Sequence, residues 1–156
     1  GFTDSILDSK NPSEKNIISV ETITGQELSF LTEAFNLKPD ARNEFAAITF
    51  SNSFGNDLLS FSISYIPKDF FPDICEDIAN NRDVLRGKYP LIPVHTKSTL
   101  DVICTDHKDA AYLKVQPGQP LICIKNILYS KSGQPVEYII TKYRADKTRL
   151  QFENHK

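Results

Sequence analysis

The sequence predicts an α+β fold, an antiparallel sheet of about six strands with helices on one face. Strand-like runs outnumber helix-like runs, the strands form two hairpins, and each half of the chain has the order strand, helix, hairpin. The chain has 156 residues, of which 40% are apolar, and this is enough for one domain with a sizeable core. We therefore expect residues 1–156 to form a single domain.

The first half begins with a strand and a helix. The run IISVETI at 17–23 is typical of a strand, and Thr24 and Glu27 have the spacing of a capping box, in which each side chain bonds a free backbone amide at the start of a helix. Apolar residues then recur at helical spacing from Leu28 until Pro39 ends the pattern. A helix is therefore predicted to begin at the capping box and to end before Pro39.

A hairpin and a central helix follow. Strand-like runs at 44–50 and 58–66 are separated by a Gly-Asn-Asp turn at 55–57. Apolar residues at helical spacing then predict a helix between Pro67 and Asn81, and the stretch YPLIPV predicts an extended entry to the second half.

The second half repeats this order. The run STLDVIC at 98–104 is typical of a strand, and Thr105 and Asp106 mark a helix start. Two further strands are predicted at 121–129 and 135–143, joined by a Ser-Gly-Gln turn. The residues expected to face inward from the helix are Ala110, Ala111 and Leu113.

Matching intervals indicate an internal duplication of the strand, helix, hairpin unit. From Pro39 to Tyr65 is 26 residues, as it is from Pro117 to Tyr143, and the glycines of the two hairpin turns keep the same offset. On this alignment Tyr65 corresponds to Tyr143.

Composition excludes several classes of function. Eighteen Lys and Arg residues stand against twenty Asp and Glu, a net charge of -2, so the chain by itself lacks the basic stripe that binding to nucleic-acid phosphates requires. No apolar run is as long as a membrane span, and the first ten residues lack a signal peptide's basic and apolar regions. We expect a cytoplasmic protein with no membrane partner.

Side chains for catalysis or metal binding are few. The three cysteines lie far apart without C-x-x-C spacing, and the three histidines have no partners at metal-ligand spacing. Cys104 could pair in space with a histidine, but burial on an apolar strand is the favoured interpretation. Nucleotide-binding loops and nucleophile elbows are also missing from the sequence. We predict no catalytic residue, no metal and no cofactor.

Several motifs follow one another in a fixed order. They are A-x-x-L at 110–113, G-Q-P-L at 118–121, S-G-Q-P-V-E-Y at 132–138 and Y-R-A-D at 143–146, preceded in the first half by F-T-D at 2–4 and I-P-x-x-F-F-P at 66–72. Together they resemble the UTRA domain, the effector-sensing module of HutC-type transcription regulators in the GntR superfamily. The resemblance spans the whole chain.

The resemblance implies a chorismate-lyase-like fold and a homodimer that binds a small-molecule effector. In this family a winged helix-turn-helix domain precedes the sensing domain and binds operator DNA. The resemblance thus implies that the chain is a fragment of a longer regulator, and that operator DNA is a partner only through the missing N-terminal domain. Two alternatives stay open: a chorismate-lyase-like enzyme, and a structural dimerisation module without a ligand.

The resemblance also places the ligand contacts. The expected ligand-binding residues are Phe2, Thr3, Asp4, Phe50, Asn52, Arg82, Glu137 and Tyr143. For the F-T-D loop, a simple helix N-cap is an equal alternative, and for Arg82 and Arg86 a solvated surface is the favoured one. Arg144 and Asp146 are expected to hold the exit turn as a hydrogen-bonded pair.

Strand alternation and one family difference refine this site. Glu137 and Tyr143 fall on one face of their strand, and the first half carries Leu59 in place of Glu137 on the interval alignment. Where the family often has R-x-R, this chain has Phe50-Ser51-Asn52, so two planar donors that would clamp a phosphate are missing. We expect an effector less anionic than a sugar phosphate, a neutral or amine-bearing metabolite with an apolar part.

Overall fold

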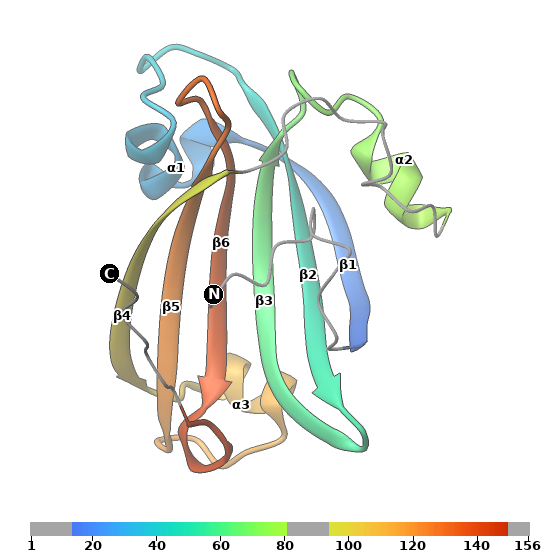
Figure 1. Ribbon diagram of the computed structural model, residues 1–156, viewed down its shortest axis with the longest axis vertical. Helices are drawn as coiled ribbons and strands as arrows, with labels where there is room; N and C mark the ends of the chain where they lie inside the picture. The colour runs from blue at the N-terminus through green and yellow to red at the C-terminus, as the bar shows by residue number, and fades with distance from the viewer. Residues whose placement is uncertain (1–13, 81–93, 150–156) are drawn as a thin grey trace.

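The structure is a computed structural model that describes residues 14–80 and 94–149 (Figure 1). Its strands are β1 (Glu14–Thr24), β2 (Glu44–Phe54), β3 (Asp57–Pro67), β4 (His95–Cys104), β5 (Pro120–Tyr129) and β6 (Pro135–Arg144). Its α-helices are α1 (Ser29–Ala34), α2 (Ile74–Ala79) and α3 (His107–Leu113), and its 3-10 helices are η1 (Gly25–Glu27) and η2 (Ala145–Lys147). The F-T-D loop, Arg82, Arg86 and most of the YPLIPV stretch lie outside the described residues.

The six strands form one antiparallel sheet in the order β1-β2-β3-β6-β5-β4. Each half of the chain contributes three neighbouring strands, and the halves meet where β3 pairs with β6 in the middle of the sheet (Figure 1). The α+β fold and the repeated order of elements are therefore as predicted.

The register of the strands corrects the residue alignment of the two halves. In each hairpin a bulge leaves one residue of the second strand unpaired, Leu59 in β3 and Val136 in β6. Ser60 and Glu137 directly follow these bulges and so take equivalent positions. The predicted correspondence of Tyr65 with Tyr143 is wrong, because these side chains lie on opposite faces of the sheet. The turns of the two hairpins differ in length, which shifts the alignment of β3 with β6. Counting residues between matching prolines, glycines and tyrosines could not detect this difference.

The two faces of the sheet carry different helices. We call the face with Ala46, Ile48 and Ile66 the α2 face, because these residues pack with Phe71, Ile74 and Ile78 of α2 and the turn before it. The opposite face, the α1 face, packs Phe45, Ala47 and Tyr65 against Leu31 of α1, and Phe61 and Leu121 against Leu113 of α3. The prediction of helices on one face thus holds for α1 and α3 but not for α2.

The ends of the helices depend on polar caps. The predicted capping box is present, with Glu27 Oε2 accepting hydrogen bonds from the Thr24 N–H (2.6 Å) and hydroxyl (3.1 Å), but it opens η1 rather than the predicted longer helix. Asp106 caps α3 as predicted, since its Oδ1 accepts a 2.7 Å hydrogen bond from the Asp109 N–H. Ala110 and Leu113 are buried as expected, whereas Ala111 is exposed.

The outer strand β4 is more exposed than the predicted burial of Cys104 implies. Among the described strands it pairs only with β5 at the edge of the sheet, and most of its side chains are exposed. Cys104 at its end is exposed, so the expected burial of this thiol is wrong. Val102 is 70% exposed and Leu100 is also largely exposed, which leaves apolar surface on this edge.

Candidate ligand-binding site

A row of buried polar side chains crosses the middle of the α2 face. Alternation along β2, β3, β6 and β5 directs these side chains to one side of the sheet. They are Asn52, Ser60, Ser62, Ser64, Asn126, Glu137 and Thr141, and we call them the polar row. Burial of a polar group costs free energy unless the group finds a hydrogen-bond partner. Seven such groups in the centre of a sheet are therefore expected to lower the stability of the fold. The polar row is therefore the first candidate for a functional site.

Hydrogen bonds link part of the polar row across three strands. The Asn52 side-chain amide donates from Nδ2 to Ser60 Oγ (3.0 Å) and to Ser62 Oγ (3.5 Å). The hydroxyl oxygens of Ser62 and Thr141 are 2.8 Å apart, which continues the chain of hydrogen bonds from β3 to β6. Asn52 is only 3% exposed, yet within residues 14–80 and 94–149 its Oδ1 has no hydrogen-bond partner. At one end of the row an acceptor is thus left unpaired by the described residues.

Glu137 brings a charge to the other end of the row. Its side chain is 0% exposed, and the hydroxyl of Ser64 donates a hydrogen bond to its Oε2. A buried carboxylate needs such donors, because removal from water strongly disfavours its ionised form. Ser64 belongs to the first half of the chain and Glu137 to the second, so the site is built from both halves.

The structure brings four predicted site residues to the same face. Phe50 and Asn52 of β2 lie on the α2 face, as do Glu137 and Tyr143 of β6. Phe50 is fully buried in the apolar cluster beside the row, and Tyr143 is partly buried opposite Ser60. The four remaining residues, Phe2, Thr3, Asp4 and Arg82, lie outside the described residues.

The predicted pair in the exit turn is confirmed. Arg144 donates from Nη2 and Nε to the two carboxylate oxygens of Asp146, at 2.8 Å and 3.2 Å. The hydrogen bond from Arg144 lowers the pKa of the Asp146 carboxyl, and the same bond raises the pKa of the guanidinium.

Sequence reasoning missed most of the polar row. The missed residues are Ser60, Ser62, Ser64, Asn126 and Thr141. The signal was present in LLSFSISYI, where serines recur at every second position of a strand and therefore share one face. The partners on β6 and β5 could be found only from the pairing of the strands.

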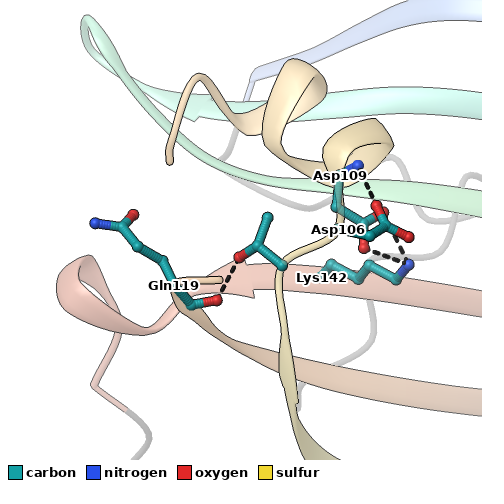
Figure 2. Close-up of polar contacts among 5 residues, drawn as sticks. Asp106, Asp109, Gln119 and Lys142 are labelled. Carbon is teal, nitrogen blue, oxygen red and sulfur yellow. Dashed lines mark hydrogen bonds and ion pairs between the residues drawn. The ribbon is translucent and has the colours of Figure 1, made fainter. Parts of the chain in front are cut away.

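A second polar cluster lies on the α1 face beneath α3 (Figure 2). Lys142 Nζ donates to both carboxylate oxygens of Asp109, at 2.9 Å and 3.0 Å. The Asp109 N–H in turn bonds Asp106, and this hydrogen bond lowers the pKa of the Asp106 carboxyl. The Thr105 hydroxyl donates to the backbone oxygen of Gln119. These contacts fasten α3 to β5 and β6, which is a structural role.

The chemistry of the polar row is that of recognition. Hydroxyls and a side-chain amide can donate or accept, and a carboxylate accepts, so the row is suited to hydroxyl and amine groups of a small molecule. In residues 14–80 and 94–149, His, Cys, Asp and Glu side chains nowhere gather in a group of three or more that could hold a metal ion. None of the helices within these ranges has the length and apolar character that a membrane span needs.

Solved structures with a similar fold include domains of bacterial proteins, one of them a GntR-family transcriptional regulator. The ligand-binding domain of a putative GntR-family transcriptional regulator from Bordetella bronchiseptica superposes with a TM-score of 0.82 at 16% identity, over 92% of this chain and 89% of that one. The C-terminal domain of Yurk from Bacillus subtilis superposes with a TM-score of 0.79 at 19% identity, over 88% and 94%. At these identities the likeness establishes the fold.

Sequence similarity then gives the family. The UTRA domain family matches residues 29–149, and the chain belongs to this family. Over 81 residues the chain is 28% identical to the uncharacterized HTH-type transcriptional regulator YurK of Bacillus subtilis. The aligned segment covers 50% of this chain and 34% of the relative. The matched part thus spans about a third of that relative's length.

Proposed function

We propose that the chain is the effector-binding and dimerisation domain of a GntR-family transcription regulator, and that a small metabolite binds at the polar row. The observation that carries this proposal is the buried row itself, with Asn52 Oδ1 unpartnered at one end and Glu137 at the other. Such a row weakens the core, and a ligand that completes its hydrogen bonds offsets that cost. Membership of the UTRA family supports the same assignment.

The composition of the row indicates the class of effector. Its single charged side chain is the carboxylate of Glu137, and the remaining members are neutral amides and hydroxyls. Phe50 packs beside them and adds apolar surface. We propose an effector with hydroxyl or amine groups and an apolar part, less anionic than a sugar phosphate. Through the family resemblance, Phe2, Thr3, Asp4, Arg82 and Tyr143 complete its contacts.

In this proposal the dimer of the regulator has two geometries, and binding of the effector shifts the equilibrium between them. A ligand shifts such an equilibrium only by its different affinity for the two states. We propose that operator DNA is bound by a part of the regulator outside residues 1–156, and that the domain has no catalytic activity. The HTH-type relative supports the first of these statements.

A ligand screen by calorimetry and thermal melting tests this proposal. Amines, uncharged sugars and aromatic acids are compared with hexosamine phosphates on the wild type, Glu137→Gln and Tyr143→Phe. A ligand at about 100 times its Kd should add about 2.7 kcal/mol to the free energy of unfolding. We expect an amine or hydroxyl compound to bind and Glu137→Gln to weaken it about tenfold or more, because the carboxylate is the strongest acceptor in the row.

The matched control is Glu21→Gln, which removes an exposed carboxylate of β1 on the opposite face of the sheet. It should leave the affinity unchanged. Phosphate-dependent binding that survives both Glu137→Gln and Tyr143→Phe would show that the pocket and its charge have been misassigned.

A further inference from the structure

A second pocket lies on the α1 face, separated from the polar row by the sheet. It has a volume of about 410 Å³ and is lined by residues of α1, β4, β5 and β6. The lining residues that matter here are Phe30, Glu33, Lys97, Lys125, Ile127 and Tyr138. Pockets for small molecules commonly have about 300–1,000 Å³, so the volume fits a compact ligand.

Two aromatic rings contribute to the lining of this pocket. The rings of Phe30 and Tyr138 are 5.1 Å apart between centroids, and Ile127 packs in the same apolar cluster. Tyr138 is 7% exposed, but its hydroxyl forms no hydrogen bond with any other described residue. Burial and, more weakly, the charges of Cys123 and Glu33 raise the pKa of this phenol. The hydroxyl is therefore a protonated donor that faces the pocket without a partner.

Two cationic side chains stand on the rim of the pocket. In the pairing of β4 with β5, Lys97 lies opposite Ile127 and Thr99 opposite Lys125, so the two lysines are diagonal neighbours on one face. Such neighbours are about 7–8 Å apart, close enough for both ammonium groups to reach one carboxylate. Neither lysine forms an ion pair within the described residues.

Glu33 of α1 limits the charge that the pocket favours. Among the described residues that line the pocket, it is the one acidic side chain, and it shares the lining with the two lysines. The two lysines and Glu33 together carry one net positive charge. This charge matches a monocarboxylate better than a phosphate dianion.

From these features we infer a second ligand site: the pocket between α1 and β4–β5 binds a small aromatic monocarboxylate. The ring lies on Phe30, Ile127 and Tyr138, and the carboxylate is held by Lys97 and Lys125. The Tyr138 hydroxyl donates a hydrogen bond to the ligand. This site is independent of the polar row, because the sheet lies between them.

Paired probes of equal shape test the site. Benzoate and indole-3-acetate are titrated into the whole chain and followed by amide chemical shifts and calorimetry, with benzamide and indole-3-acetamide as uncharged counterparts. We expect the two acids to bind more tightly than the amides and to shift resonances of α1, β4 and β5. Lys97→Gln or Lys125→Gln should each lower the acid affinity about fivefold, the effect of one partly exposed charge pair.

Two control variants separate this site from a general charge effect and from the polar row. Lys108→Gln removes an exposed lysine on α3, and Glu137→Gln alters the polar row. Both should keep the wild-type affinity for benzoate. The inference is overturned by equal binding of acids and amides, by full affinity in the Lys97→Gln/Lys125→Gln double variant, or by no shift change at millimolar benzoate. Because both lysines are exposed, the double variant should keep its fold.

Discussion

Asn52 is the residue at which the proposed ligand recognition and the stability of the core make opposite demands. It donates hydrogen bonds to Ser60 and Ser62, while its own Oδ1 has no partner among the described residues. A buried acceptor without a partner costs about 1–3 kcal/mol. The residue is therefore poorly explained by stability alone.

A change of Asn52 to leucine separates the two roles. Asn52→Leu keeps a similar volume and removes the unpaired acceptor, so we expect the free energy of unfolding to fall by no more than about 1 kcal/mol, although two serines lose a donor. Binding of the effector found by the ligand screen should be lost. Urea unfolding and calorimetry measure the two quantities, and an unchanged effector affinity would exclude Asn52 from the site.

At the scale of the element, α3 depends on its N-cap residue, Asp106. Seven residues are too few for a helix that is stable by itself, so its cap and its contacts must hold it in place. Asp106 accepts the Asp109 N–H, and Lys142 bonds the Asp109 carboxylate, which joins the start of the helix to β6 (Figure 2).

Loss of this cap should be measurable by thermal unfolding. Asp106→Ala is expected to lower Tm by about 2–4 °C, whereas Asp106→Asn should stay near the wild type, because asparagine is an equally good cap. The pKa of Asp106 is lowered in the folded chain, so its contribution is present above the unfolded pKa and is lost as the pH falls through the folded one. The difference between wild type and Asp106→Ala should therefore shrink in acid. A difference that is constant with pH would contradict this explanation.

The elements themselves could largely be predicted from the sequence, whereas their placement could not. Alternation correctly put Glu137 and Tyr143 on one face, since a strand has a fixed period of two. Bulges change that parity without a reliable sequence signal, which is why Tyr65 was paired with the wrong residue. The predicted burial of Cys104 is wrong for another reason. An apolar run in the sequence does not reveal that its strand lies at the edge of the sheet.

At the scale of the whole molecule, the two edge strands of the sheet, β4 and β1, differ in their exposed apolar surface. On β4, Leu100 and Val102 are apolar and exposed, and an edge that no described strand pairs with favours pairing with another chain. The opposite edge, β1, also exposes Ile17 and Ile18, but at 41% and 47% they are less exposed than Val102 at 70%. Family membership leads us to expect a two-fold dimer, and the more exposed β4 is the edge we expect it to cover.

Sedimentation of matched edge variants tests this expectation. The wild type should be a homodimer at tens of micromolar, roughly the working range of a moderate dimer. Val102→Lys should shift it toward monomer, because a charge on β4 would be buried in the interface. Ile17→Lys makes the same change on β1 and should leave the dimer intact. A monomeric wild type, or equal effects of the two variants, would contradict the assignment.

The register of β3 with β6 has a consequence for how any ligand could lie in the polar row. The two halves are related by an approximate two-fold axis through the paired Ile63 and Ile140, which relates Ser60 to Glu137. A perfectly symmetric site would offer a ligand two equivalent poses, turned by half a revolution, and so two competing bound states. A hydroxyl in one half and a carboxylate in the other make these poses unequal in energy, because an ionised carboxylate attracts an ammonium group more strongly than a neutral hydroxyl does. Divergence at this one pair of positions is enough to give an amine-bearing ligand a single orientation.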